Sequence, residues 1–320
     1  MDWTDRIGRR VKLRDLHILL AVAQSGSMAR AADRLAISHP VVSKTITELE
    51  RALGVRLLDR TAQGVELNEY GRAFIKCGTA VFDELRRGVQ EIELISDPTV
   101  GEVRVGSTGP LADGLLPTAI ERLAKRHPRI EVHAADGDSP TLCDMLRKRD
   151  VDFVVSRTWG SRFGEDFAGE YLFDETMFVI AGLKNPWSSR RTINFADLLD
   201  EPWVLPELDN PVGALIVEGF RRSGTALPKP RVVSNSMAVR TRLVEGGHFL
   251  TMLPGSMLHF GAGRLRVKKL PVALPLESQP IEIIGLRNRT LNAVARLFVQ
   301  ELREVVRPLL KNRLSTSRTT

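Results

Sequence analysis

The sequence predicts an α/β protein that begins with a helical region and one long connecting helix. Apolar residues recur at helical spacing through most of the first hundred positions. Beyond Gly101, short apolar runs typical of strands alternate with helical patterns, which favours helices layered on parallel strands. Residues 1–60 hold 11 basic and seven acidic side chains, whereas residues 61–100 hold four and seven. This change of sign and the Pro98–Gly101 break indicate two domain boundaries.

Composition narrows the class of protein. A chain of 320 residues is long enough for two or three domains. Its net charge of +7 is compatible with nucleic acid or acidic ligands as partners, without proving either. The two cysteines, Cys77 and Cys143, exclude a disulfide scaffold and fit a reducing compartment. We find no export signal and no apolar stretch long enough to span a bilayer, so we expect a soluble cytoplasmic protein without a membrane partner.

Two short helices joined by a tight turn are expected between residues 27 and 53. Ser27 can cap the first helix and Ser38 the second, because their side chains accept hydrogen bonds from free N–H groups. Pro40 fits the first turn of a helix, where a missing N–H costs nothing. Gly54 is expected to end the second helix. Helix, turn and helix share one apolar face.

A two-stranded wing and a long helix follow. Residues 55–60 and 65–67 read as short strands around a polar turn. Asn68 is expected to cap a helix of about 42 Å, at about 1.5 Å per residue, that reaches Ile95. Its apolar seam has a nearly heptad spacing and consists of Phe74, Val81, Leu85, Val89 (or Gly88), Ile92 and Ile95. Such a seam favours pairing with a second copy of the chain; the alternative is packing against the chain's own later domain.

Helix, turn, helix and wing together have the shape of a DNA-binding motif. The second helix would enter the major groove, which is about 12 Å wide. Its outward hydroxyls, Val41 and Lys44 suit base edges, a thymine methyl or phosphates. The expected DNA contacts are Ser27, Arg30, Ser38, His39, Pro40, Val41, Ser43, Lys44, Thr47 and Arg60. Paired amphipathic helices also occur in proteins that never meet DNA, so spacing alone leaves that alternative open.

The stretch from Ser27 to Phe74 resembles the winged helix-turn-helix of LysR-type transcriptional regulators. The matching positions, in the family's order and spacing, are Ser27, Ala31, Ala32, Leu35, Ser38, Pro40, Ser43, Ile46, Leu49, Glu50, Leu53, Gly54, Leu57, Arg60, Leu67 and Gly71. Residues 101–107, 150–156 and 251–258 extend a weaker resemblance through the rest of the chain. Three positions depart from the family pattern: His39 replaces a common Gln, Leu58 a usual Phe and Asn68 a common Thr. The first of these leaves the base preference undefined.

The resemblance implies an architecture and a function. The chain would be a sequence-specific transcriptional regulator, not an enzyme, and a dimer or tetramer that binds inverted-repeat promoter sites in double-stranded DNA. A small-molecule coinducer would control it, with RNA polymerase as a further partner. The implied parts are a winged helix-turn-helix (1–67), a linker and dimerisation helix (68–97), a two-lobed effector domain resembling type II periplasmic binding proteins (98–310; lobe I about 98–181 and 270–310, lobe II about 182–269) and a loose tail (311–320).

The effector is expected between the two lobes, where strands end and helices begin. Ser107 and Thr108 end the first strand with hydroxyls and N–H groups that suit a carboxylate or phosphate, and the resemblance makes this the commonest effector contact. Arg157 ends a second strand and can pair with an anion. The expected effector-binding residues are Ser107, Thr108, Ser139, Arg157, Leu205, Pro206 and Thr251. We therefore expect a small anionic coinducer, with a carboxylate favoured. Alternatively, Ser107 and Thr108 only cap the next helix and Arg157 forms an ion pair between the lobes.

Other chemistry finds little support. The six histidines lack metal-ligand spacing, and the chain has no serine nucleophile elbow or phosphate-binding loop, so we expect no catalytic residues, metal or cofactor. Two alternatives remain: a cytoplasmic solute-binding protein, or a two-lobed enzyme with an accessory N-terminal domain. As an alternative mechanism, a thiol redox sensor would need reactive cysteines, but we interpret Cys77 and Cys143 as packing residues.

Overall fold

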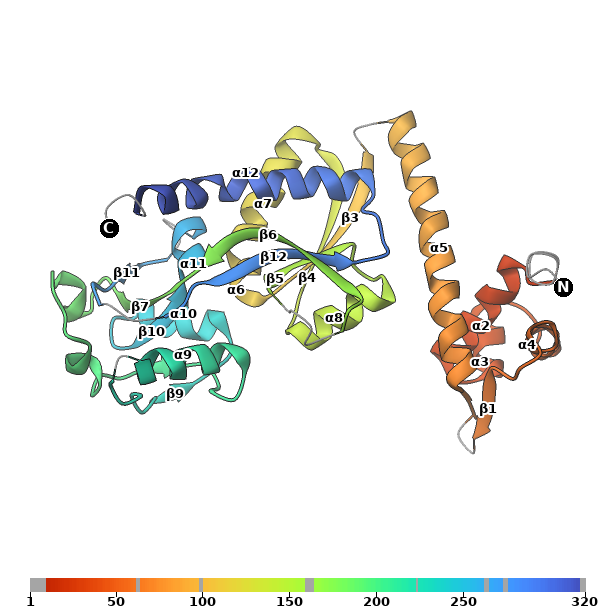
Figure 1. Cartoon of the computed structure of the whole chain (residues 1–320), viewed down its shortest axis with the longest axis horizontal. Coiled ribbons are helices and arrows are strands. Elements are labelled where there is room, and N and C mark those ends of the chain that lie inside the picture. Colours follow the sequence, from red (N-terminus) through yellow and green to blue (C-terminus); the bar gives the residue numbers. More distant parts are fainter. Residues whose placement is uncertain are drawn as a thin grey trace. The chain divides into compact units, whose positions relative to one another are not determined.

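The computed structural model describes residues 10–61, 64–97, 100–158, 164–222, 224–261, 265–272 and 276–316. The chain divides into two compact units, residues 1–92 and residues 93–320, each of which is described by itself (Figure 1). None of the helices within these ranges combines the length and the apolar character needed to cross a membrane.

The N-terminal unit is built from short helices and a hairpin. Its elements are α2 (Leu13–Ser25), α3 (Met28–Arg34), α4 (His39–Leu53), β1 (Leu58–Thr61), β2 (Gly64–Leu67) and most of α5 (Glu69–Ser96). Ile18, Ile46 and Leu49 lie in its buried core, because α2 and α4 present apolar side chains at helical spacing. The expected helix, turn and helix are confirmed: α4 ends at Leu53, and Gly54 adopts the left-handed conformation with φ 76°.

Glu50 of α4 fastens the wing to the helical core. Its carboxylate accepts hydrogen bonds from the Leu57 N–H at 2.8 Å and the Leu58 N–H at 3.3 Å. The strand β1 therefore begins at Leu58, three residues later than expected, because the preceding segment is held against α4. The expected cap of the long helix is confirmed, since the Asn68 Oδ1 accepts from the Gly71 N–H at 2.9 Å.

Lobe I of the second unit is a five-stranded sheet in the order β4-β3-β5-β12-β6. Its strands are β3 (Val100–Ser107), β4 (Arg129–Asp136), β5 (Phe153–Arg157), β6 (Phe167–Glu175) and β12 (Gln279–Leu286). Two helices, α7 (Leu115–Arg126) and α12 (Ala293–Thr316), cover one face, and α8 (Ser139–Lys148) covers the other (Figure 1). The strand β5 is buried on both faces, as its apolar run predicts.

Lobe II contains two small sheets. One has the strand order β10-β7-β11 and the other pairs β8 with β9. The elements are β7 (Met177–Gly182), β8 (Val204–Leu205), β9 (Val232–Val233), β10 (Leu250–Pro254), β11 (Val267–Lys269), α9 (Pro211–Arg222), α10 (Met237–Glu245) and α11 (Gly255–Phe260), with short 3-10 turns at Pro186–Ser189 and Phe195–Leu198. Trp203, Phe195 and Phe220 form an aromatic cluster in its core.

Two expectations about the sheets of the second unit need correction. The sheets are mixed and not purely parallel, because β12 runs antiparallel to β5 and β6, and β7 runs antiparallel to both of its neighbours. The chain leaves lobe I at Thr176 and not near Gly182, since β7 hydrogen-bonds within the lobe II sheet. It returns near Ser278 and not near residue 270, since Leu270 and Leu276 pack in the lobe II core. Short apolar runs specify neither the direction of a strand nor the sheet it joins.

The C-terminal helix is longer than expected. We expected a loose tail to begin at residue 311, but α12 continues to Thr316. Leu309 lies one turn beyond Val305 and packs against the lobe I core, so the apolar face of the helix reaches almost to the expected start of the tail. Residues 317–320 of the expected tail lie outside the described residues.

The Glu50 contact gives a stability prediction. Glu50→Ala leaves the Leu57 and Leu58 N–H groups without their acceptor, and we expect it to lower the free energy of unfolding by about 1–3 kcal/mol. Glu50→Gln keeps an acceptor oxygen and should cost clearly less. Urea unfolding of the full-length variants measures both. Equal losses in the two variants would contradict a role for this hydrogen bond.

Candidate nucleic-acid interface and ligand cleft

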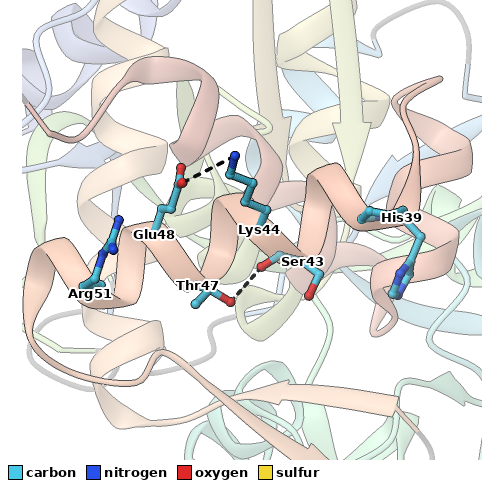
Figure 2. Close-up of a pocket in the computed structure, with 7 residues that line it drawn as sticks. His39, Ser43, Lys44, Thr47, Glu48 and Arg51 are labelled. Carbon is cyan, nitrogen blue, oxygen red and sulfur yellow. Dashed lines mark hydrogen bonds and ion pairs between the residues drawn. The ribbon is translucent and has the colours of Figure 1, made fainter.

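The outward face of α4 forms a shallow polar groove (Figure 2). It is lined by His39, Pro40, Ser43, Lys44, Thr47, Glu48 and Arg51. Five of these were expected from the sequence, and the exposed Val41 lies on the same helix. Arg51 and Glu48 were not expected, although a helical step of four from Thr47 to Arg51 would have placed that cation on the outward face.

Local contacts leave the polar groups of this groove available. The Lys44 Nζ lies 4.0 Å from the Glu48 carboxylate, but the lysine side chain is 77% exposed. An exposed ion pair of this kind is weak, so the ammonium group can exchange Glu48 for an external anion. The Thr47 hydroxyl donates to the Ser43 carbonyl at 2.9 Å, which leaves its oxygen able to accept a hydrogen bond (Figure 2).

The helix starts differ in how they are capped. The Ser27 hydroxyl accepts from the Arg30 N–H at 3.5 Å, so this serine caps α3 as expected, while the Arg30 side chain is exposed. Ser38 occupies the cap position of α4 but makes no side-chain cap bond. Its exposed hydroxyl is therefore available to meet a phosphate at the positive end of the helix. Arg60 lies in β1, and its side chain is outside the described residues.

In lobe I, candidate ligand groups meet where adjacent strands end. Ser107 of β3 pairs with Val155 of β5 on one side and with Asp136 of β4 on the other. Thr108 occupies the cap position before α6 (Gly109–Asp113) but makes no side-chain cap bond, and the Ser107 hydroxyl donates to the Thr108 carbonyl at 3.3 Å. Within the described residues, no hydrogen bond supports the interpretation of these hydroxyls as mere helix caps. Ser139 begins α8, just beyond the end of β4, and is half-buried.

Ser156 is a candidate that sequence reasoning missed. It is 1% exposed, and its hydroxyl has no hydrogen-bond partner among the described residues. Buried hydroxyls are normally paired, so this unpaired hydroxyl is unusual, and strand alternation places it on the α8 face of the sheet, opposite to Arg157. A polar residue at the end of an otherwise apolar strand was the available signal.

Arg157 and Glu175 place charge near the join between the lobes. Burial lowers the pKa of the half-buried Arg157, while the carboxylate of Glu175 opposes that shift. Glu175 is 4% exposed, and burial raises its pKa above the ordinary value of 4.5. Arg157 has no carboxylate within ion-pair distance in the described part of the chain, so Glu175 acts on it only at longer range. Among the described residues, the expected alternative of a direct ion pair between the lobes is therefore not seen.

The join itself is held by hydrogen bonds around Glu175. The Ser256 N–H donates to the Glu175 carboxylate at 3.1 Å, and the Ser256 hydroxyl donates to it as well. The two chain crossings also meet, because the hydroxyls of Thr176 and Ser278 lie 2.7 Å apart. The buried carboxylate of Glu175 thus connects lobe I to the first turn of α11.

The lobe II candidates are less accessible. Leu205 and Pro206 are buried at the end of β8. Thr251 is fully buried, and its hydroxyl donates to the Val204 carbonyl at 2.7 Å and accepts from Arg240 at 3.4 Å. Thr251 is therefore engaged inside lobe II. Arg240, which no pattern in the chain singles out in advance, becomes the main polar group there.

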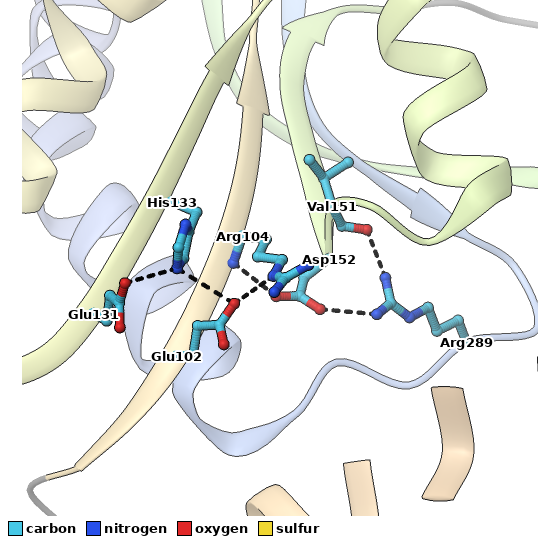
Figure 3. A network of polar contacts seen from close by, with 7 residues as sticks. All are labelled: Glu102, Arg104, Glu131, His133, Val151, Asp152 and Arg289. Carbon is cyan, nitrogen blue, oxygen red and sulfur yellow. Dashed lines mark hydrogen bonds and ion pairs between the residues drawn. The ribbon is translucent and has the colours of Figure 1, made fainter. Parts of the chain in front are cut away.

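A second polar network lies at the opposite ends of the lobe I strands. His133 sits between Glu131 and Glu102, at 3.0 and 3.5 Å (Figure 3). Asp152 accepts from the Arg104 N–H at 2.8 Å and from Arg289 at 2.9 Å. The polar groups of this network contact one another, so we interpret the network as structural.

The cysteines differ in environment. Cys143 is buried among apolar side chains, and burial raises its pKa, so its role as a packing residue is confirmed. Cys77 is exposed on α5, which corrects its interpretation as a packing residue within this chain. Cys143 is the sole cysteine between residues 93 and 320, so no disulfide can form within that unit. In the described residues, no three histidine, cysteine or acidic side chains gather as a metal site.

Comparison with known families decides the identity. Residues 13–72 match the bacterial regulatory helix-turn-helix protein, lysR family, and residues 96–307 match the LysR substrate binding domain. The chain belongs to the LysR family. It is a DNA-binding transcriptional regulator with a substrate-binding domain, and not an enzyme. The alternatives of a solute-binding protein or a two-lobed enzyme are not favoured.

Curated relatives span nearly the whole LysR-type chain. The transcriptional regulator PcaQ of Agrobacterium fabrum is 25% identical over 307 residues, which cover 96% of this chain and 99% of PcaQ. The dual regulator GltC of Bacillus subtilis is 26% identical and covers 91% and 96%. The dual regulator OxyR of Escherichia coli is 28% identical and covers 93% and 95%.

Solved structures confirm the LysR-type fold. Full-length OxyR from Pseudomonas aeruginosa superposes with a TM-score of 0.65 at 21% identity, over 92% of this chain and 95% of that one. Full-length CbnR in complex with its target DNA gives 0.53 at 22% identity, over 93% and 100%. The expected winged helix-turn-helix, linker helix and substrate-binding domain are thereby confirmed as a fold.

The buried Glu175 makes stability depend on pH. Because its pKa is raised above 4.5, the folded protein holds this proton more tightly than the unfolded chain, and stability falls as pH rises through that window. Glu175→Gln keeps an oxygen for the Ser256 N–H but does not titrate. Urea unfolding measures the free energy of unfolding of both proteins. The value for Glu175→Gln minus the value for the unmodified protein should increase from pH 4.5 towards neutrality. The exposed Glu304→Gln serves as control, and a difference that shrinks with pH would contradict the assignment.

Proposed function

We propose that this LysR-type regulator reads inverted-repeat promoter sites with α4 and responds to a small anionic coinducer held between the lobes of its substrate-binding domain. The observation that carries the DNA half is the exposed polar face of α4, where Ser43, Lys44 and Thr47 line one groove. A regulator of promoters acts where the chromosome lies, so a cytoplasmic location is part of this proposal.

Roles can be assigned along α4. Lys44 and Arg51 supply cations to phosphates or to guanine, while Ser43 and Thr47 offer hydroxyls to base edges. Ser38 with the start of the helix would meet a backbone phosphate. His39 lies at the first turn, where it can donate to a base or to a phosphate. The fold shared with CbnR, whose structure holds its target DNA, supports this docking.

The long helix supports a paired assembly. Val81, Leu85, Val89, Ile92 and Ile95 of α5 are all exposed. Soluble chains rarely leave a regular apolar stripe of this length uncovered, and its spacing suits a partner helix. We therefore propose that two chains pair through α5, which would present two copies of α4 to the two halves of an inverted repeat.

The ligand half of the proposal rests on the strand ends of lobe I. Arg157 has no carboxylate within ion-pair distance among the described residues. The Thr108 hydroxyl, at the end of the adjacent strand, caps no helix. A carboxylate ligand would pair with the arginine and accept a hydrogen bond from the Thr108 hydroxyl.

The role of Lys44 at the DNA can be measured by salt dependence. Lys44→Ala should weaken binding to the gene's own upstream region and reduce the log–log slope of affinity against salt by about 0.9 for each phosphate that the variant no longer neutralises. Lys148→Ala, a comparably exposed lysine that also pairs with a carboxylate four residues away, should leave the slope unchanged. Gel-shift titrations at several salt concentrations provide the measurement. Equal affinity for the upstream region and a scrambled duplex would overturn the proposal.

The ligand site can be tested with organic acids. Ser107→Ala and Arg157→Ala should each weaken binding of the acid that most stabilises the unmodified protein, by about tenfold for the arginine, because that variant cannot form the charge-assisted hydrogen bond. Arg307→Ala, an exposed arginine of α12, is the control. Isothermal titration measures the affinities. Unchanged affinity in both variants would remove the site assignment.

A further inference from the structure

Arg240 is a buried cation in lobe II. It lies in the first turns of α10 and is 3% exposed. Its guanidinium donates to the Thr251 hydroxyl at 3.4 Å, to the Met252 carbonyl, and to the Met237 sulfur at 3.5 Å. All of these acceptors are neutral.

No carboxylate balances this charge within ion-pair distance in the described ranges. Burial lowers the pKa of Arg240 to about 10, so the side chain remains a cation at neutral pH. Two other buried groups in the same unit form ion pairs: Asp152 with Arg289 at 2.9 Å, and Glu301 with two arginines. A buried charge without a counter-ion destabilises the folded protein. Arg240 is therefore a buried cation without a counter-ion among the described residues.

Met237 places this cation at the contact between the lobes. Its sulfur touches the Arg240 guanidinium, and its Cγ lies 4.0 Å from the point where a side chain on Gly109 would begin. Gly109 is the first residue of α6 in lobe I and directly follows Thr108. One half-buried methionine thus separates Arg240 from the strand ends that carry the proposed ligand groups. Methionine is flexible enough to move aside at low cost.

We propose that Arg240 is the lobe II anchor for a second acidic group of the effector, and that Met237 covers this anchor until the ligand enters. The inference rests on the proposed interlobe ligand site and narrows its ligand class to dianions such as dicarboxylates. One acidic group pairs with Arg157 in lobe I and the other with Arg240 in lobe II. Such a ligand neutralises both cations and so favours the arrangement in which the lobes approach each other.

A purely structural role for Arg240 predicts different behaviour. If its bonds to Thr251 and Met252 served only to hold α10 on β10, its removal would weaken folding and would not affect the choice between acids. The anchor role instead predicts a selective effect, confined to ligands that carry two acidic groups. The two roles can therefore be separated by comparing matched ligands on one variant.

The experiment uses the full-length protein and acids matched in carbon number: succinate with butyrate, glutarate with valerate, and adipate with hexanoate. Thermal shift and isothermal titration measure binding to the unmodified protein, to Arg240→Met and to Arg157→Ala. At least one dicarboxylate should bind the unmodified protein about tenfold or more tightly than its monocarboxylate. Arg240→Met should lose that preference and retain the weaker monocarboxylate binding, whereas Arg157→Ala should lose both.

A second variant guards against failure of Arg240→Met to fold. Met237→Ala leaves Arg240 in place and removes its cover, so it should raise dicarboxylate affinity and leave monocarboxylate affinity unchanged. An unchanged preference in Arg240→Met, or equal effects of Met237→Ala on both acids, would overturn the anchor. If Arg157→Ala still abolished binding in that case, the interlobe site would stand without it. An unmodified protein that none of the three dicarboxylates stabilises would contradict this ligand class.

Discussion

The substrate-binding domain depends on how charge is buried where its two lobes join. Glu175 ends the edge strand of lobe I, and the first turn of α11 in lobe II supplies two donors to its carboxylate. Hydrogen bonds from Ser256 offset part of the cost of taking this anion out of water. The same junction holds both chain crossings, through Thr176 and Ser278. Directed polar contacts therefore link the lobes at this junction, and Phe260 of α11 adds an apolar contact by packing against the lobe I core.

Two arginines near this junction, Arg157 and Arg240, have no carboxylate within ion-pair distance among the described residues. Arg157 feels Glu175 only at longer range, and Arg240 has neutral acceptors alone. Elsewhere in the domain, the buried Asp152 forms a close pair with Arg289. Uncompensated positive charge is thus concentrated beside the interlobe contact. An anion that bridges the lobes would relieve it, and this links ligand chemistry to the relative position of the lobes.

In the DNA-binding unit, by contrast, polar groups are satisfied by hydrogen bonds to residues nearby in the sequence. Glu50 holds the wing, Asn68 caps the long helix and Ser27 caps α3, so short-range bonds set the position of α4. The outward side chains of α4 take little part in these bonds. On the surface that would meet DNA, Thr47 and Lys44 contact Ser43 and Glu48 of the same helix.

Patterns local in the chain were readable in advance. Helix spacing, the caps at Ser27 and Asn68, Gly54 and the outward face of α4 depend on neighbours a few residues apart, and the resemblance carried by residues 27–74 named the family. The sheet order, the crossing at Thr176 and the length of α12 depend on contacts between distant segments. No sequence pattern distinguishes Arg240 or Ser156 from other residues of their type. Their significance comes from which partners folding brings near them and which it leaves absent, because burial and charge pairing are properties of three-dimensional neighbours.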